Sequence, residues 1–124
     1  MTAPRRILVV EDDPSLRETL AEVLEDDGHE VRVAEDGEAA LEAIHEWTTE
    51  LIVLDLMMPR MDGYAFRQAQ RAHAGTVETK ILLLSAAHQV EAAAEELQAD
   101  AWLVKPFGLH DVLESVEGLL GSPR

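Results

Sequence analysis

The chain carries short, uninterrupted apolar runs that each end in a polar residue, and this pattern constrains its fold more than any other feature. The runs cover residues 7–10, 51–54, 81–84 and 102–104. Continuous runs of this length suit strands that are buried on both faces of a parallel sheet. In Val31–Ala34, Val31 and Val33 instead alternate with Arg32, which predicts a half-exposed strand at a sheet edge.

Amphipathic helical patterns lie between the predicted strands. Their apolar positions are Leu16, Leu20, Val23 and Leu24; Ala40, Leu41 and Ile44; Phe66 and Ala69; Val90, Ala93, Ala94 and Leu97; and Leu109, Val112, Leu113, Val116 and Leu120. The first helix is expected to begin near Pro14 and to end at Gly28. Strands that alternate with helices predict an α/β fold with right-handed crossovers. We expect one domain over residues 1–124, with residues 121–124 as a tail or linker stub.

Acidic residues outnumber basic ones by 25 to 10, which gives the 124-residue chain a formal net charge of −15. This field repels phosphate backbones, so we expect no direct binding to nucleic acid. No apolar run is long enough to span a bilayer, and Glu11, Asp12 and Asp13 end the first run too early for a signal peptide. Because the chain also has no cysteine, we expect a cytoplasmic protein without membrane contact.

Polar residues that can hold a metal or a phosphoryl group stand at the ends of the predicted strands. They are Glu11–Asp13, Asp55, Ser85 and Lys105–Pro106. In open parallel sheets, ligands bind beyond the C-terminal ends of the strands. We therefore expect these groups to converge on one edge of the sheet.

The acidic members of this set predict a metal site. Glu11, Asp12 and Asp55 would repel one another in a shared pocket, and a divalent cation relieves that repulsion. Hard oxygen ligands suit Mg²⁺, with Mn²⁺ as the alternative ion. Glu11–Asp13 considered alone would fit a solvated acidic loop, but Asp55 at the adjacent strand end favours the metal site.

Asp55 follows four apolar residues, so its carboxylate is expected at the mouth of a dry core. Such a carboxylate can attack phosphorus and form an acyl phosphate. Lys105 and Ser85 could each hold a phosphoryl oxygen, although Ser85 could instead cap the fourth helix and Lys105 could pair with an acidic neighbour. Backbone N–H groups would complete the cage at Leu56, Met57 and Ala86.

Several segments together resemble the receiver domains of two-component response regulators. They are Ile7–Pro14 (ILVVEDDP), Leu51–Gly63 (LIVLDLMMPRMDG), Ser85–Ala86 and Leu103–Phe107 (LVKPF). The resemblance covers essentially the whole chain, in order. It implies a single-domain, doubly wound (βα)5 sandwich of the flavodoxin-like type, with five parallel strands in the order 2-1-3-4-5. It also implies a phosphorylation switch that assists its own phosphorylation and dephosphorylation, not an enzyme.

The resemblance assigns expected roles to the matching residues. Asp55 is the expected phosphoacceptor, Ser85 and Lys105 bind the phosphoryl group, and Ser85 also takes part in switching. The Lys105–Pro106 peptide bond is expected to be cis, an uncommon state even before proline.

The metal ligands follow from the same resemblance. Asp12 and Asp55 are expected to contact Mg²⁺, Glu11 to act mainly through water, and the carbonyl of Met57 to supply a backbone ligand. Asp13 is expected to be an adjacent extra charge.

Two positions depart from the family pattern. Trp102 stands where relatives usually have Tyr or Phe as a rotameric switch, and we expect the larger indole to disfavour the inward state. The alternative role for Trp102 is that of a partly buried aromatic on an edge strand. Gln98 stands where relatives commonly have glycine, so a positive φ there would cost about 1 kcal/mol relative to glycine.

The resemblance implies two kinds of partner: a sensor histidine kinase or histidine phosphotransfer protein, and a downstream effector at the face of the fourth and fifth helices. These helices, expected at 88–98 and 109–121, contain no Lys or Arg. They carry Glu91, Glu95, Glu96, Asp111, Glu114 and Glu117. Because two copies of such a face repel each other, we expect a monomer, or a dimer through another surface, and a basic partner.

Other functions fit less well. A phosphatase of the haloacid dehalogenase type needs a second acid two residues after its nucleophile, where this chain has Met57, and no glycine-rich nucleotide loop occurs. The remaining alternative is a receiver-like interaction module that signals without phosphorylation. The five histidines lack metal-ligand spacing and are expected at the surface: His29, His45, His73, His88 and His110.

Overall fold

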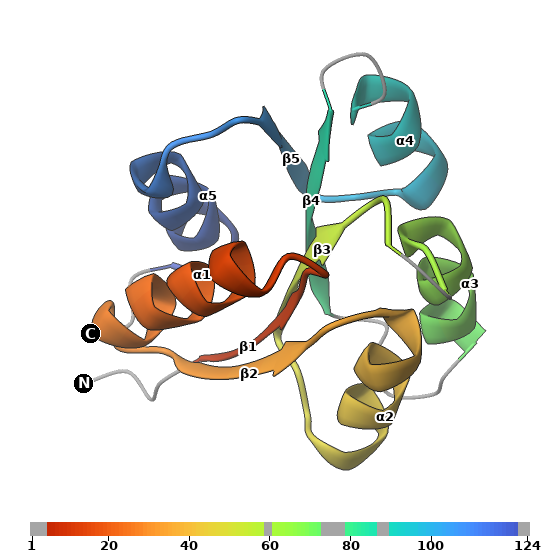
Figure 1. Ribbon diagram of the computed structural model, residues 1–124, viewed down its shortest axis with the longest axis horizontal. Helices are drawn as coiled ribbons and strands as arrows, with labels where there is room; N and C mark the ends of the chain where they lie inside the picture. The colour runs from red at the N-terminus through yellow and green to blue at the C-terminus, as the bar shows by residue number, and fades with distance from the viewer. Residues whose placement is uncertain (1–4, 59–60, 73–78, 87–89, 122–124) are drawn as a thin grey trace.

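The computed structural model describes residues 5–58, 61–72, 79–86 and 90–121, in which five strands alternate with five helices (Figure 1). The elements are β1 (Arg6–Val10), α1 (Pro14–Asp26), β2 (Glu30–Ala34), α2 (Gly37–Glu46), β3 (Leu51–Asp55), α3 (Gly63–Ala72), β4 (Lys80–Ala86), α4 (Val90–Leu97), β5 (Ala101–Lys105) and α5 (Leu109–Leu120). All strand pairs are parallel, in the order β2-β1-β3-β4-β5. The expected flavodoxin-like α/β fold and strand order are therefore confirmed.

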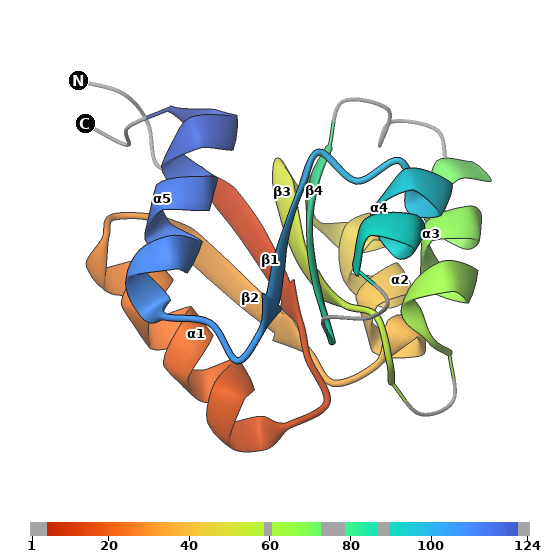
Figure 2. The same cartoon turned by 90° about the horizontal axis from the view of Figure 1, so that it is seen from above.

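Two helical layers cover the sheet, with α1 and α5 on one face and α2, α3 and α4 on the other (Figure 2). The side chains of the three central strands alternate between two cores because successive residues of a strand point to opposite faces. Ile7, Val9, Leu51, Val53, Leu82 and Leu84 contribute to the core on the side of α1 and α5. Leu8, Val10, Ile52, Leu54, Ile81 and Leu83 contribute to the other core. All twelve are fully buried, which explains why these strands read as continuous apolar runs.

The two edge strands differ from this pattern. The predicted edge position of β2 is confirmed, but Val33, which the alternation with Arg32 placed on the buried side, is 48% exposed. Burial of residues 102–104 on both faces, which the apolar run predicted, is wrong. Trp102 is 45% exposed, and Leu103 and Val104 are only partly buried. The physical reason is that β5 pairs only with β4, so it lacks a strand neighbour on its outer side.

Local side-chain contacts set the helix starts that matter for the strand-end region. Asp13 is the N-cap of α1, because its carboxylate accepts a hydrogen bond from the Ser15 N–H at 3.1 Å, and Pro14 follows as the first helical residue. The chain leaves α1 through Gly28, whose φ of 98° is accessible to glycine at little cost. Among the described residues, no helix is long and apolar enough to cross a membrane.

The surface location expected for the histidines is wrong for His29. This residue lies between α1 and β2, is 6% exposed, and neither ring nitrogen has a hydrogen-bond partner in the described part of the chain. Burial lowers the pKa of His29, although the Asp27 carboxylate 3.7 Å away partly opposes this. His45 and His110 are exposed, as expected. His73 and His88 lie outside the described residues.

Gln98, which follows α4, has a φ of 55°. This left-handed conformation is costly for a residue with a Cβ atom. We predict that Gln98→Gly raises the free energy of unfolding by about 1 kcal/mol, measured by urea denaturation. The matched control is Gln68→Gly on the exposed side of α3, which should lower stability by about 1 kcal/mol. A destabilised Gln98→Gly variant would contradict the left-handed conformation.

Candidate functional site

The C-terminal ends of four strands bring the predicted site residues together at one edge of the sheet. Glu11 directly follows β1, and Asp55 is the last residue of β3. Ser85 lies near the end of β4, opposite Val104, one residue before Lys105 at the end of β5. Glu11, Asp55 and Ser85 are each at most 3% exposed. These polar groups therefore lie where the apolar interior of the sheet ends.

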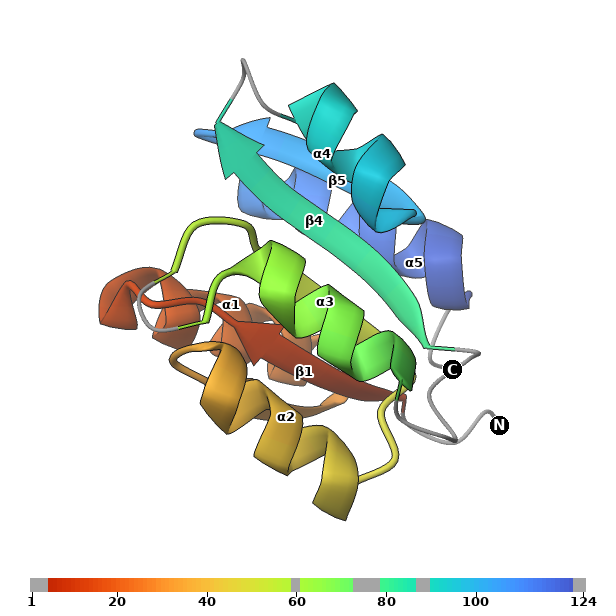
Figure 3. The ribbon, with the colours of Figure 1, turned by 90° about the vertical axis from the view of Figure 1, so that its right-hand side faces the viewer.

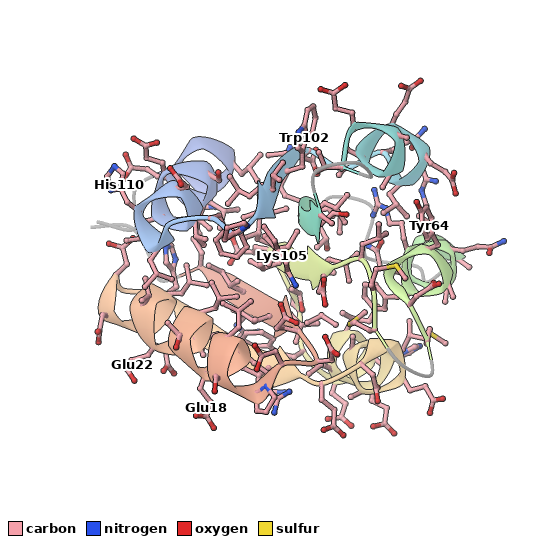
Figure 4. All side chains as sticks on the ribbon, turned by 45° about the horizontal axis from the view of Figure 1, so that its top comes forward. Glu18, Glu22, Tyr64, Trp102, Lys105 and His110 are labelled. Atoms are coloured by element: carbon pink, nitrogen blue, oxygen red, sulfur yellow. The ribbon has the colours of Figure 1, made fainter. Side chains whose placement is uncertain are left out.

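Lys105 connects two of the carboxylates. Its ammonium nitrogen lies 3.1 Å from Oδ1 of Asp55 and 3.2 Å from Oε1 of Glu11. Figure 4 shows the Lys105 side chain reaching from β5 toward the ends of the central strands. Lys105 thus pairs with acidic neighbours, and both neighbours belong to the predicted site.

Three carboxylates are close enough to share one cation. Oxygen atoms of Glu11, Asp12 and Asp55 all lie within 4.8 Å of one another. Glu11 and Asp55 are buried, whereas Asp12 is exposed and faces solvent. A donor set made only of carboxylate oxygens is of the kind that Mg²⁺ and other hard cations prefer.

The same crowding changes the acidities of the group. Burial, and next the charge of Glu11, raise the pKa of Asp55 to about 7 from the usual 3.8. Burial would also raise the pKa of Asp12, but hydrogen bonds with Glu11 and Asp55 outweigh it and lower that pKa. For Lys105, burial would lower the pKa, but the charges of Asp55 and Glu11 outweigh burial and raise it. Near neutral pH, Asp55 is therefore divided between its protonated and ionised forms when no cation compensates the carboxylates.

The acidic turn after β1 is fixed by contacts that the sequence patterns did not reveal. An Arg17 guanidinium nitrogen donates to the carbonyls of Glu11 at 3.0 Å and of Asp12 at 3.5 Å. The Asp13 N–H donates to the Glu11 carboxylate at 3.2 Å. Asp13 was expected to be an extra charge, but it also caps α1. The sequence does contain a signal for this contact. Arg17 stands in the first turns of the helix that follows the acidic turn.

The turn after β3 is close-fitting. The Leu56 N–H donates to the Leu84 carbonyl at 3.0 Å, and the Gly63 N–H donates to the Leu56 carbonyl at 2.8 Å. A Cβ atom on Gly63 would lie 3.0 Å from the Leu56 Cα, so glycine allows α3 to begin this close to the end of β3. Because its N–H is already engaged, Leu56 does not offer the free donor that was expected of it. Met57, the next residue, is 58% exposed.

Ser85 carries a buried hydroxyl that has no partner among the described residues. Its Oγ makes no hydrogen bond with them, although the residue is only 2% exposed. An unsatisfied buried hydroxyl is costly, so a ligand oxygen at this position would be favoured. The neighbouring Lys105–Pro106 peptide bond is cis, as the resemblance implied.

Trp102, which was named from the sequence as a switch residue, lies apart from this cluster. Trp102 pairs with Leu83, further back along the strands, and its ring is exposed at the edge of the sheet (Figure 4). Whether it changes rotamer stays a prediction. Residues 59–60 and 87–89 lie outside the described residues.

The model of the response regulator receiver domain family matches residues 7–117. Response regulator MprA of Mycolicibacterium vanbaalenii is 39% identical over 119 residues, which are 94% of this chain and 51% of that protein. The chain thus spans about half the length of the curated relatives it matches.

Solved structures of similar proteins agree with this match. Chemotaxis response regulator CheY4 of Vibrio cholerae has a TM-score of 0.88 at 31% identity, over 95% of this chain and 100% of that one. Response regulator TrrA of Thermotoga maritima, solved in complex with Mg²⁺ and BeF, has a TM-score of 0.81 at 35% identity, over 94% of this chain and 99% of that one.

The raised pKa of Asp55 predicts a pH-dependent effect on stability. The folded-state pKa of about 7 exceeds the usual 3.8, so the folded protein holds the Asp55 proton more tightly than the unfolded chain does. The free energy of unfolding therefore falls as the pH rises through 7 and Asp55 loses its proton. We predict that Asp55→Asn stabilises the metal-free protein at pH 8 by on the order of 2 kcal/mol, and by much less at pH 5. Urea denaturation with a chelator measures this difference.

The control variant is Asp26→Asn, which changes the same charge at an exposed position at the end of α1. It should change stability little at either pH. An equal effect of Asp55→Asn at pH 5 and pH 8 would contradict the raised pKa.

Proposed function

Because the chain belongs to the response regulator receiver domain family, we propose that Asp55 is the phosphoacceptor and that Mg²⁺, or alternatively Mn²⁺, is held beside it. The ligands would be Asp12, Asp55 and the Met57 carbonyl, with Glu11 acting mainly through water. The observation that carries this proposal is the meeting of three carboxylates within 4.8 Å, two of them buried and in contact with Lys105. A receiver domain is a signalling switch, not an enzyme that acts on a separate substrate.

The phosphoryl group would come from a phosphohistidine of a sensor kinase or histidine phosphotransfer protein. A carboxylate oxygen of Asp55 attacks phosphorus, the P–N bond breaks, and its electrons leave with the imidazole. The product is an acyl phosphate on Asp55. Attack requires the ionised carboxylate, so the proton that burial favours on Asp55 must leave first. When bound, Mg²⁺ neutralises charge on the transferring group.

Two side chains would then hold the phosphoryl oxygens. Lys105 already lies 3.1 Å from Asp55, so its ammonium can follow the new negative charge from the carboxylate to the phosphoryl group. The unpartnered Ser85 hydroxyl would donate to a second oxygen and thereby gain the hydrogen bond it lacks. Backbone N–H groups of Met57 and Ala86 would complete the cage.

The signal would pass to a partner at the face of α4 and α5, in the cytoplasm. Neither helix contains Lys or Arg, and His110 is paired with Glu114 at 3.2 Å. A face of this charge repels its own copy and attracts basic surfaces. We therefore propose a monomeric receiver with a basic effector, and an exposed Trp102 that stays outward when Asp55 is phosphorylated.

The test of the phosphoacceptor is intact mass after incubation with acetyl phosphate and Mg²⁺. We expect the native chain and Asp26→Asn to gain one phosphoryl group and Asp55→Asn to gain none. A chelator should abolish the gain. If the folded native chain binds Mg²⁺ but gains nothing, the interaction module that signals without phosphorylation is the better interpretation. A gain that persists in Asp55→Asn would show that another residue is the acceptor.

The position of Lys105 predicts competition with the cation. Its ammonium contacts two of the three carboxylates, so Lys105→Met makes the site more negative. We expect Mg²⁺ binding, measured calorimetrically at low salt, to become about fivefold tighter, which corresponds to about 1 kcal/mol. Phosphorylation by acetyl phosphate should be lost. The control Lys80→Met removes the same charge at the start of β4. Weaker Mg²⁺ binding in Lys105→Met would mean that the ammonium organises the carboxylates.

A further inference from the structure

A groove between α3 and α4 lies apart from the strand-end site. It has a volume of about 340 Å³ and is lined by Tyr64, Arg67, Gln68, Arg71, Glu96 and Leu97. The four residues from α3 are spaced at i, i+3, i+4 and i+7, so they form one stripe along that helix. Figure 3 shows α3 and α4 on the same side of the sheet, and Figure 4 labels Tyr64 in the first turn of α3.

Arg67 is a partly buried cation whose hydrogen bonds to the described residues all go to uncharged oxygens. Its guanidinium donates to the carbonyls of Leu97 at 2.8 Å and Gln98 at 3.3 Å, and to the side-chain oxygen of Gln70 at 2.5 Å. The bonds to Leu97 and Gln98 link the end of α4 to α3. No carboxylate among the described residues forms an ion pair with it. Burial, and next the charge of Arg71, lower the pKa of Arg67, and the charge of Asp100 opposes them in part.

Arg71 adds a second positive charge to the same groove. It is exposed, lies one helical turn beyond Arg67, and makes no hydrogen bond or ion pair with a described residue. The C-terminal end of α3 and the exposed Glu96 offset part of this charge. The planar guanidinium of Arg71 still has N–H donors that no described residue occupies. Such a group can bind a carboxylate through two parallel hydrogen bonds.

We propose that the groove between α3 and α4 binds an acidic segment of a partner protein, with a carboxylate on the guanidinium of Arg71. The ring of Tyr64 would contact an apolar residue beside that carboxylate. A volume of about 340 Å³ accommodates more than one side chain, which favours a peptide segment over a single small anion. With only 10 basic residues against 25 acidic ones, few other places on this chain attract an acid.

In the test, the full chain is titrated with a blocked hexapeptide that has two glutamates between leucines. Binding is monitored through the amide chemical shifts of the full chain. Shifts should concentrate in α3 and in the last turn of α4. The matching peptide with two glutamines should produce none. Arg71→Gln should weaken binding about tenfold, and Arg71→Lys, which keeps the charge but lacks the planar guanidinium, should weaken it less. Lys80→Gln makes the same change in net charge elsewhere and should leave binding within about twofold.

Several results would overturn the proposal. These are no shifts at millimolar peptide, shifts centred on other elements, equal binding of the glutamine peptide, or equal losses in Arg71→Gln and Lys80→Gln. Inorganic phosphate is the competing occupant. If phosphate alone causes the same shifts with the same affinity, the groove is a small-anion site and the assignment to a protein segment is wrong. None of these readouts depends on phosphorylation of Asp55.

Discussion

Repulsion between carboxylates at the dry end of a parallel sheet is the interaction on which the rest of this structure depends. Glu11 and Asp55 are buried side by side, and the ammonium of Lys105 is the only cation that contacts both among the described residues. Two negative charges and one positive charge leave the pocket with an excess of negative charge. This excess favours the binding of either a proton or a divalent cation. Binding of an ion at this point is therefore a consequence of how the fold positions its acids.

The scaffold is suited to hold such an arrangement because its rigid parts surround the site. The central strands are buried between two cores, which leaves the strand ends little freedom to spread apart. The two acidic turns are fixed in different ways. Arg17 holds backbone carbonyls after β1, whereas close packing at Gly63 holds the turn after β3. A site with mutually repelling groups keeps its geometry only when its surroundings are stabilised independently.

The central part of the fold and the residues of the site could be predicted from the sequence because both depend on chain-local patterns. Continuous apolar runs indicated β1, β3 and β4, and the polar residue after each run indicated the site. Exposure of β5 could not be read from its apolar run, because it depends on β5 having no outer neighbour. Burial of His29 and the contacts of Arg17 likewise depend on which segments meet in space. The positive φ at Gln98 was suggested only by the glycine that relatives commonly have there, because the glutamine side chain itself does not indicate the turn geometry.

The strand order also has a consequence for biosynthesis. β1 is the first strand of this sheet to be made, yet in the folded sheet it lies between β2 and β3. Its wholly apolar Ile7–Val10 segment can pair on one side once residues 30–34 have left the ribosome, but the other side must wait for residues 51–55. During that interval the nascent chain presents an unpaired apolar edge, the kind of surface that chaperones bind and that promotes aggregation. The element that organises the finished sheet is thus the one left incomplete for longest during its synthesis.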